Sequence, residues 1–347
     1  MGRRIEGWLE GKEKWPELDA AVEMSARDNV FFTPWMQHRA LEALAKEMLM
    51  EDVLRKWLGQ YPGPEPAASG KVCGVVAAGN IPAVAFHDIL SVLAAGWKPV
   101  VKLSSKDRYL LPVLFPGVEF CDSTDGWTPD ALLTMGGDAA AAYFETHFPY
   151  IPKIIRASRF SIAVLTGSED SSALEALAED MLLYYGLGCR SVTCLLVPQG
   201  CDLSEMMAAA EAFALRHWER PGRDNHRKNK AVLTLSGEEF LDSGTVIFRD
   251  LRRMMPGASE DVSLCRPLDM SLHVGEVWYV EYRSEKELEK FIGANEGRIQ
   301  KIIRNFGYAQ RPALDDWPDG VDTVGFLRGI KNKSYDGIQI QGGYSRQ

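Results

Sequence analysis

A strand–helix–strand pattern over residues 71–103 constrains the fold of this chain more than any other feature of its sequence. Residues 72–76 form a short, valine-rich apolar run that is typical of a buried parallel strand. Residues 84–95 are apolar at helical spacing and stop at Gly96, and residues 99–103 form a second strand-like run. A strand, a helix and a strand in this order form a right-handed βαβ unit with parallel strands. The pattern therefore predicts an α/β fold.

The same alternation continues along most of the chain. Further strands are predicted at 131–137, 161–165, 192–198 and 277–282, with helices at 138–146 and 172–185. Such alternation indicates mainly parallel sheets. Outside it, we expect a helical cap (20–58, with a helix starting at Pro34 after the cap residue Thr33), a proline-rich loop (61–66), a long exposed basic loop (216–230) and one or two helices (285–305).

Composition limits the classes of protein to which the chain can belong. A length of 347 residues allows about two domains, and 46% apolar with 25% charged residues is an ordinary globular balance. The net charge of -9 speaks against nucleic-acid binding, which needs a basic surface. No apolar run approaches the ~20 residues of a membrane span, and residues 1–12 carry no secretory signal. We therefore expect a cytoplasmic protein with no membrane span and no nucleic-acid partner.

Cysteine spacing argues against both a disulfide framework and a metal site. None of the six cysteines has C-x-x-C spacing, and no histidine lies at ligand spacing from one. Cys189 differs from the others because it follows Gly188 between a predicted helix and a predicted strand, where active sites tend to lie. Arg190 beside it is expected to lower the pKa of the thiol. The alternative is that Cys189 is a small buried hydrophobe, as we expect of Cys73 and Cys194.

A turn rich in lysine and serine follows the second strand of the βαβ unit. Lys102, Ser104, Ser105 and Lys106 lie at the carboxyl end of that strand, which is the edge where open α/β sheets bind ligands. Two lysines and two hydroxyls suit a ribose and a 2′-phosphate, and the alternative is a solvated turn. No G-x-G-x-x-G run accompanies the unit, so a standard dinucleotide fingerprint is absent.

Three blocks stand in a fixed order along the sequence: Gly79-Asn80-Ile81-Pro82, Val101-Lys102-Leu103-Ser104-Ser105-Lys106, and Gly186-Leu187-Gly188-Cys189. In this order and spacing they resemble the aldehyde dehydrogenase superfamily, and within it the LuxC-type acyl-CoA reductases. The resemblance covers about residues 30–330 and implies an aldehyde dehydrogenase-like α/β fold with mainly parallel sheets. A Rossmann-like cofactor domain with its helical cap would span residues 1–157, with 310–347 returning to it. A catalytic cysteine domain would span residues 158–309.

The resemblance also implies roles for individual residues. Cys189 would be the nucleophile, and the Asn80 side chain and the Cys189 backbone N–H would donate to the oxyanion. The cofactor contacts would come from one turn and one later loop (Lys102, Ser104, Ser105 and Lys106; Thr134 and Gly136). The superfamily's glutamate general base would fall near Ile155 and Arg156, and a second glutamate near Leu272, but no carboxylate stands at these positions. Without this base the acyl-cysteine should be hydrolysed only slowly, which favours its reduction or its transfer to another thiol.

The expected function is NADPH-dependent reduction of an acyl thioester, on coenzyme A or on a carrier, to an aldehyde. NADPH is chosen over NADH because of Lys102 and Lys106. Three alternatives remain open: an acyl phosphate reductase of the semialdehyde dehydrogenase type, an acyl-transfer protein, and a non-catalytic homologue that acts as a binding subunit. The basic stretch 216–230 would either receive the phosphates of coenzyme A or be a solvated surface. A homodimer or larger homo-oligomer is expected, with the tail 337–341 as a candidate pairing strand.

Overall fold

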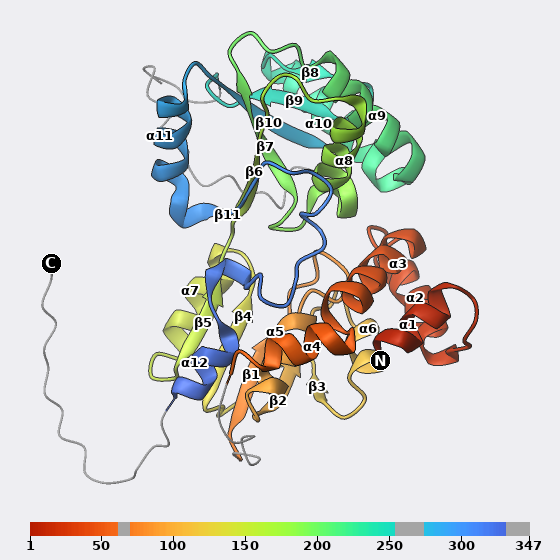
Figure 1. Cartoon of the computed structure of the whole chain (residues 1–347), viewed down its shortest axis with the longest axis vertical. Helices are drawn as coiled ribbons and strands as arrows, with labels where there is room; N and C mark the ends of the chain where they lie inside the picture. The colour runs from red at the N-terminus through yellow and green to blue at the C-terminus, as the bar shows by residue number, and fades with distance from the viewer. Residues whose placement is uncertain (62–69, 254–273, 331–347) are drawn as a thin grey trace, which may run out of the picture.

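The computed structural model describes residues 1–61, 70–253 and 274–330. Figure 1 shows two lobes, each built around its own β-sheet. Residues 72–156 supply the strands of the first sheet, and residues 160–303 supply those of the second. After the second sheet the chain returns to the first lobe and forms a short helix there (Figure 1). The predicted α/β class with mainly parallel sheets is confirmed.

The first sheet has five parallel strands in the order β3-β2-β1-β4-β5. The strands are β1 (Val72–Val76), β2 (Lys98–Lys102), β3 (Glu119–Cys121), β4 (Ala131–Met135) and β5 (Lys153–Arg156). Their connections include α5 (Phe86–Ala94), α6 (Leu110–Leu114) and α7 (Asp138–His147). The predicted βαβ unit is β1-α5-β2. Because β1 lies between β2 and β4, the winding of the chain reverses between β1 and β4.

The second sheet has six strands in the order β11-β6-β7-β10-β9-β8, and only the β8–β9 pair is antiparallel. The strands are β6 (Phe160–Val164), β7 (Val192–Pro198), β8 (Leu241–Asp242), β9 (Ile247–Asp250), β10 (Glu276–Tyr282) and β11 (Ile299–Ile303). The helices are α8 (Ser171–Leu182), α9 (Ser204–His217), α10 (Arg220–Ser236) and α11 (Glu285–Asn295), with 3-10 turns at Leu183–Gly186 and Glu296–Arg298.

The N-terminal helices pack against the first lobe, and their upper end approaches the second lobe (Figure 1). They are α1 (Gly2–Leu9), α2 (Pro16–Asp28), α3 (Pro34–Ala43), a π-helical turn (Leu44–Met48) and α4 (Glu51–Leu58). The predicted helix start is confirmed, because the Thr33 side chain accepts a hydrogen bond from Met36 N at 3.2 Å. The returning segment forms a 3-10 turn (Pro318–Gly320) and α12 (Thr323–Gly329), which packs on α5.

Helices cover both faces of each sheet, which explains the continuous apolar runs in the strands. In β7, Leu195 and Val197 pack with α8 and α9, whereas Cys194 and Leu196 pack with α11 on the other face. Full burial of a side chain of this size stabilises the fold by about 1.5–3 kcal/mol. The prediction that Cys73 and Cys194 are core residues is confirmed, since both are buried.

The prediction of an exposed loop over 216–230 is wrong, because α9 ends at His217 and α10 begins at Arg220. α10 has a proline in its first turn, which is a favourable position for proline. Its buried residues recur every three or four positions, at Gly222, His226, Asn229 and Leu233. This is helical spacing, but three of the four residues are polar or lack a side chain. A search for apolar periodicity does not detect such a stripe.

The prediction of helix throughout 285–305 is also wrong in its last part. Residues 299–303 form the edge strand β11 beside β6, with Ile299 and Ile303 buried. Pairing with β6 satisfies the backbone groups of this segment on one side, and the sheet buries its two isoleucines. The short strands β3, β5, β8 and β9 are additional to those predicted.

Three expectations concern residues outside the described part of the chain: the loop at 62–66, the position near Leu272 and the tail strand at 337–341. The expected domain boundary at 157/158 would fall in the loop between β5 and β6 and remains a proposal. Within the described ranges, no helix combines the length and the apolar character that crossing a membrane requires.

Candidate active site

A cavity of about 930 Å³ lies where loops of the two sheets meet. The segments that follow β1, β2, β4 and β5 all line it, at 78–84, 104–106, 135–137 and 156–159. Residues 187–190, before β7, line it from the other sheet. Because the winding reverses between β1 and β4, this edge is a topological switch point, where α/β sheets bind ligands. The cavity also has the size of a small-molecule site.

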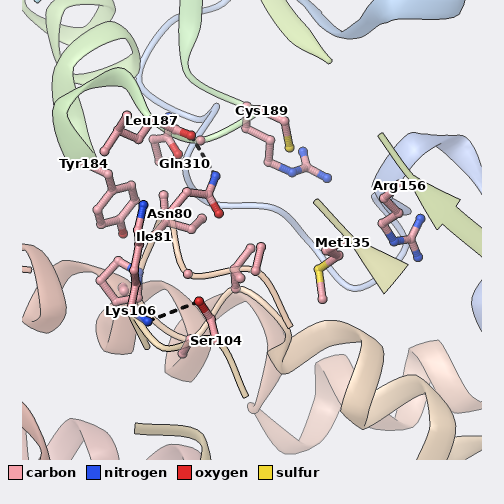
Figure 2. A pocket seen from close by; sticks show the side chains of 18 of the residues that line it. Asn80, Ile81, Ser104, Lys106, Met135, Arg156, Tyr184, Leu187, Cys189 and Gln310 are labelled. Carbon is pink, nitrogen blue, oxygen red and sulfur yellow. Dashed lines mark hydrogen bonds between the residues drawn. The ribbon is translucent and has the colours of Figure 1, made fainter. Parts of the chain in front are cut away.

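Six of the eight predicted site residues line this one cavity: Asn80, Ser104, Ser105, Lys106, Gly136 and Cys189. Figure 2 shows several of them with Tyr184, Arg156 and Gln310. Lys102 and Thr134 are not among the lining residues, and Thr134 is buried. The predicted roles stay predictions, but the blocks that carried the resemblance come together in space.

Cys189 follows a sharply bent segment between α8 and β7. Tyr184 (φ 56°), Tyr185 (φ 58°) and Gly186 (φ 74°) all adopt left-handed backbone conformations. For residues other than glycine this costs about 1–2 kcal/mol each, and such strain is concentrated at functional sites. On the other side of the thiol, Ser161 Oγ donates to the Cys189 carbonyl at 2.8 Å and fixes the loop to β6.

The Cys189 thiol lies deep in the cavity, where solvent reaches it although protein surrounds it on most sides. Burial raises its pKa above the ordinary thiol value, and the charge of Arg190 only partly offsets this effect. Arg190 does lower the pKa of the Cys189 thiol, as expected. The expectation of a lowered pKa is nevertheless wrong, because burial raises it by more. The guanidinium of Arg190 is itself engaged, because it donates to Asp316 Oδ2 at 2.7 Å.

Asn80 is held against the cysteine loop by a hydrogen bond. Its Nδ2 donates to the Leu187 carbonyl at 2.7 Å (Figure 2). A primary amide has two N–H donors, so the second one remains for a ligand. The backbone behind Asn80 is fixed at Ala83, which is left-handed (φ 54°) and donates its N–H to Asp107 Oδ2 at 2.8 Å. The carboxyl group of the neighbouring turn therefore positions the Asn80 loop.

The turn after β2 packs closely against that loop. Ser104 Oγ accepts a hydrogen bond from Lys106 N at 3.2 Å (Figure 2). A Cβ added to Gly79 would lie 2.8 Å from Ser104 Cβ and 2.9 Å from Lys106 Cβ, so only glycine permits this approach. Among the described residues, no carboxylate pairs with the Lys106 ammonium.

The loop after β4 leads into a helix N-terminus at the same edge. Gly136 and Gly137 line the cavity, and no side chain caps the first N–H groups of α7. Unpaired N–H groups at a helix N-terminus suit a phosphate. With the hydroxyls of Ser104 and Ser105 and the ammonium of Lys106, they form the set of donors that the riboses and phosphates of a dinucleotide need. The residues present therefore fit a nicotinamide dinucleotide.

Arg156 stands where the resemblance would place a glutamate base, and it is buried in an ion pair. Its guanidinium donates to Asp88 at 2.8 and 3.2 Å, to Thr323 Oγ1 at 3.0 Å and to the Pro318 carbonyl at 2.7 Å. Burial opposes the charge of Asp88, yet Arg156 holds the pKa of this carboxyl below its usual value. Arg156 therefore ties the returning C-terminal segment to α5 and leaves no base at this position.

Several polar residues of the cavity were not predicted, among them Gln310 and Asp319, which come from the returning segment. Gln310 Nε2 donates to Ser191 Oγ at 3.0 Å and so supports the cysteine loop. Asp319 is left-handed (φ 59°) and its carboxylate lies 3.4 Å from Arg159 Nε. Burial raises its pKa, against the opposing effect of the nearby arginines. No local signal marks either residue, because both reach the site only through the chain's return.

We expect Asp107 to make stability depend on pH. Burial raises its pKa from 3.8 to about 7, so its contribution to stability is complete below about 3.8 and is lost as pH rises through about 7. Asp107→Asn keeps an acceptor for Ala83 N but cannot ionise. The free energy of unfolding of Asp107→Asn minus that of the wild type should therefore rise by about 1 kcal/mol per pH unit between pH 5 and 7 and then level off. Urea denaturation at each pH measures this difference, and a constant difference would contradict the assignment.

Comparison with known proteins identifies the fold. No family model and no curated protein matches the chain. Among solved structures, it is similar to a propionaldehyde dehydrogenase from a Clostridium phytofermentans bacterial microcompartment (TM-score 0.53, 9% identity, 88% of this chain and 83% of that one). It is also similar to a betaine aldehyde dehydrogenase from Staphylococcus aureus (0.55, 12%, 88% and 74%) and to an NADP dependent enzyme from E. coli (0.56, 10%, 88% and 76%). The chain therefore has the aldehyde dehydrogenase fold, as the resemblance implied.

Proposed function

We propose that this chain uses NADPH to reduce an acyl thioester to an aldehyde through an acyl group carried on Cys189, as LuxC-type acyl-CoA reductases do. The observation that carries the proposal is one cavity that contains an accessible thiol, an amide donor and a dinucleotide-like set of donors, with a buried arginine at the position of the base. The fold is that of enzymes named for aldehyde oxidation and reduction chemistry.

In the first half of the reaction Cys189 attacks the thioester carbonyl as a thiolate. The carbonyl oxygen becomes an oxyanion, and the free N–H of Asn80 and the backbone N–H of Cys189 donate to it. A fixed donor of this kind contributes about 3 kcal/mol to transition-state stabilisation. Collapse of the tetrahedral species breaks the carrier's C–S bond, expels the carrier as a thiolate, and leaves the acyl group on Cys189.

In the second half the acyl-cysteine is reduced. A nicotinamide cofactor held by Ser104, Ser105 and Lys106 would supply the hydride for the acyl carbon. Asn80 again holds the developing oxyanion, and the resulting thiohemiacetal collapses to aldehyde and the Cys189 thiolate. Water is a poor competitor here because Arg156, paired with Asp88, cannot act as the base that would activate it.

Apolar side chains line another part of the cavity and suit a hydrocarbon acyl group. They come from α3 and the turn after it, at Ala40, Ala43, Leu44 and Met48. Burying such a group against them is favourable by about 0.8 kcal/mol for each CH₂.

Intact-mass spectrometry tests the proposal. The protein is incubated with a panel of acyl-CoAs, first without and then with NADPH. We expect a stable acyl adduct without the cofactor, and its loss together with formation of aldehyde when NADPH is added. NADH is run in parallel, because of the two lysines from which the preference for NADPH was inferred only Lys106 lines the cavity.

The other outcomes of this experiment distinguish the alternatives. An adduct that NADPH and NADH both leave intact would show an acyl-transfer protein. Turnover of acyl phosphates but not of thioesters would replace the proposed substrate class. No adduct from either class would favour a non-catalytic homologue.

A further inference from the structure

Most charged side chains that line the cavity already have a partner. Three arginines pair with three aspartates, and a fourth aspartate pairs with an arginine outside the cavity (Arg156–Asp88, Arg159–Asp319, Arg190–Asp316 and Asp28–Arg27). Among the described residues, Lys106 and Lys228 line the cavity without a carboxylate partner. The cavity therefore has a surplus of positive charge in a chain whose net charge is -9. Such a surplus attracts anionic ligands.

Lys228 lies on α10, the most basic helix of the chain. Five basic residues and a single acidic one fall within its bounds (Arg220, Arg223, Arg227, Lys228 and Lys230; Asp224). Internal pairs engage three of the five: Arg220 and Arg227 with Asp224, and Lys230 with Asp242. Within the described ranges Lys228 has no such pair, and it lines the cavity together with Asn225, one turn earlier on the same face.

A buried hydroxyl in the same cavity also lacks a partner. Thr193, four residues after Cys189 on β7, is 5% exposed, and its Oγ1 forms no hydrogen bond within the described chain. Leaving such a group unpaired costs about 1–3 kcal/mol, so a ligand that pairs with it gains affinity. This observation is independent of the charge of α10 and also indicates a polar ligand that extends beyond the thiol.

We propose that Lys228, with Asn225 beside it, binds a phosphate group of the carrier that delivers the acyl group to Cys189. The inference rests on the proposed function and names the part of the substrate that α10 recognises. Coenzyme A and carrier-protein phosphopantetheine share a phosphate at the far end of a pantetheine arm from the sulfur. An ammonium binds such a phosphate as a point charge, and a neighbouring amide adds a hydrogen bond.

Single-turnover acylation of Cys189 without cofactor tests this inference. Three donors of one acyl group are compared: acyl-CoA, acyl-phosphopantetheine, and the acyl thioester of N-acetylcysteamine, which has no phosphate. Lys228→Gln should lower the second-order rate constant about tenfold for donors with phosphate at low salt, which corresponds to about 1.4 kcal/mol. The N-acetylcysteamine thioester should react at the wild-type rate. Because salt screens exposed charges, added salt should shrink the difference.

Lys230→Gln is the matched control. It removes the same charge from the same helix, but Lys230 pairs with Asp242 and does not line the cavity. Its rate constants should stay within about twofold of the wild type. A loss shared by acyl-CoA and acyl-phosphopantetheine assigns Lys228 to the pantetheine phosphate, and a loss confined to acyl-CoA assigns it to the nucleotide phosphates.

Two results would overturn the inference and leave the proposed function standing. One is equal rates for Lys228→Gln and Lys230→Gln with every donor, and the other is an equal loss with the N-acetylcysteamine thioester. Failure of the wild type to form an adduct with any of the three donors would instead contradict the proposed function.

Discussion

Cys189→Ala should abolish both the acyl adduct and aldehyde formation, with a loss of activity on the order of 10⁴-fold or more. The covalent route depends on one sulfur atom, and among the described residues no other side chain that lines the cavity is a thiol. Because the Cys189 side chain lines the cavity and is not part of a hydrophobic core cluster, its truncation leaves no void in the core and should not change the free energy of unfolding. Intact mass measures the adduct, and NADPH absorbance measures turnover.

Cys201→Ala is the control for this variant. Cys201 is also partly exposed, but it lies at the end of β7 away from the cavity. Its variant should keep both the adduct and the activity. An adduct of normal stoichiometry on Cys189→Ala would show that another group is the nucleophile.

The raised pKa of Cys189 adds a pH dependence to the same measurement. Burial keeps the thiol protonated at neutral pH, and Arg190 and Arg156 oppose this only in part. The reactive thiolate fraction should therefore grow about tenfold per pH unit through the neutral range. The acylation rate should rise accordingly and level off only above the ordinary thiol pKa. A rate independent of pH between 6 and 9 would indicate a thiolate already formed in the free protein.

Arg156→Met should destabilise the fold by about 3–5 kcal/mol, because it leaves Asp88 buried without a counter-charge. The Asp88 side chain is 2% exposed, and that of Arg156 is 6% exposed. The same substitution frees Thr323 and the Pro318 carbonyl, so the C-terminal segment that carries Asp319 should loosen first. Urea denaturation gives the free energy, and hydrogen exchange of α12 gives the local effect.

Arg55→Met is the matched control, since Arg55 pairs with Glu51 on exposed α4. An exposed pair of this kind contributes about 0–1 kcal/mol. Adding Asp88→Asn to Arg156→Met should recover much of the lost stability, because the uncompensated charge is then gone. Equal effects of Arg156→Met and Arg55→Met would show that the buried pair does not hold the returning C-terminal segment in place.

Much of the fold could be predicted because parallel strands covered on both faces must be apolar along their whole length. The run 72–76 and the helical pattern 84–95 identify β1 and α5, and both are confirmed. The basic helix α10 could not be found in this way. Its buried stripe contains Gly222, His226 and Asn229, which a hydropathy pattern reads as solvent-facing. Asn229, for example, is buried because its Nδ2 donates to the Val274 carbonyl at 3.0 Å.

The sequence by itself determined the loops that could carry chemistry. Ser104 and Cys189 are predicted from position, because each follows or precedes a strand and strand ends meet at a sheet edge, whereas Asn80 is predicted only through the resemblance. Only the tertiary structure decided what surrounds them. Arg156 and Asp88 are 68 residues apart, and Arg156 and Thr323 are 167 apart. The first pair joins α5 to β5 within the first lobe, and the second depends on the return of the C-terminal segment to that lobe. These contacts bury Arg156, which stands where the base was expected, and engage its guanidinium. The pKa of Cys189 is a second example. Arg190 is adjacent in the sequence, but the burial that outweighs its effect on the thiol pKa exists only in the assembled cavity.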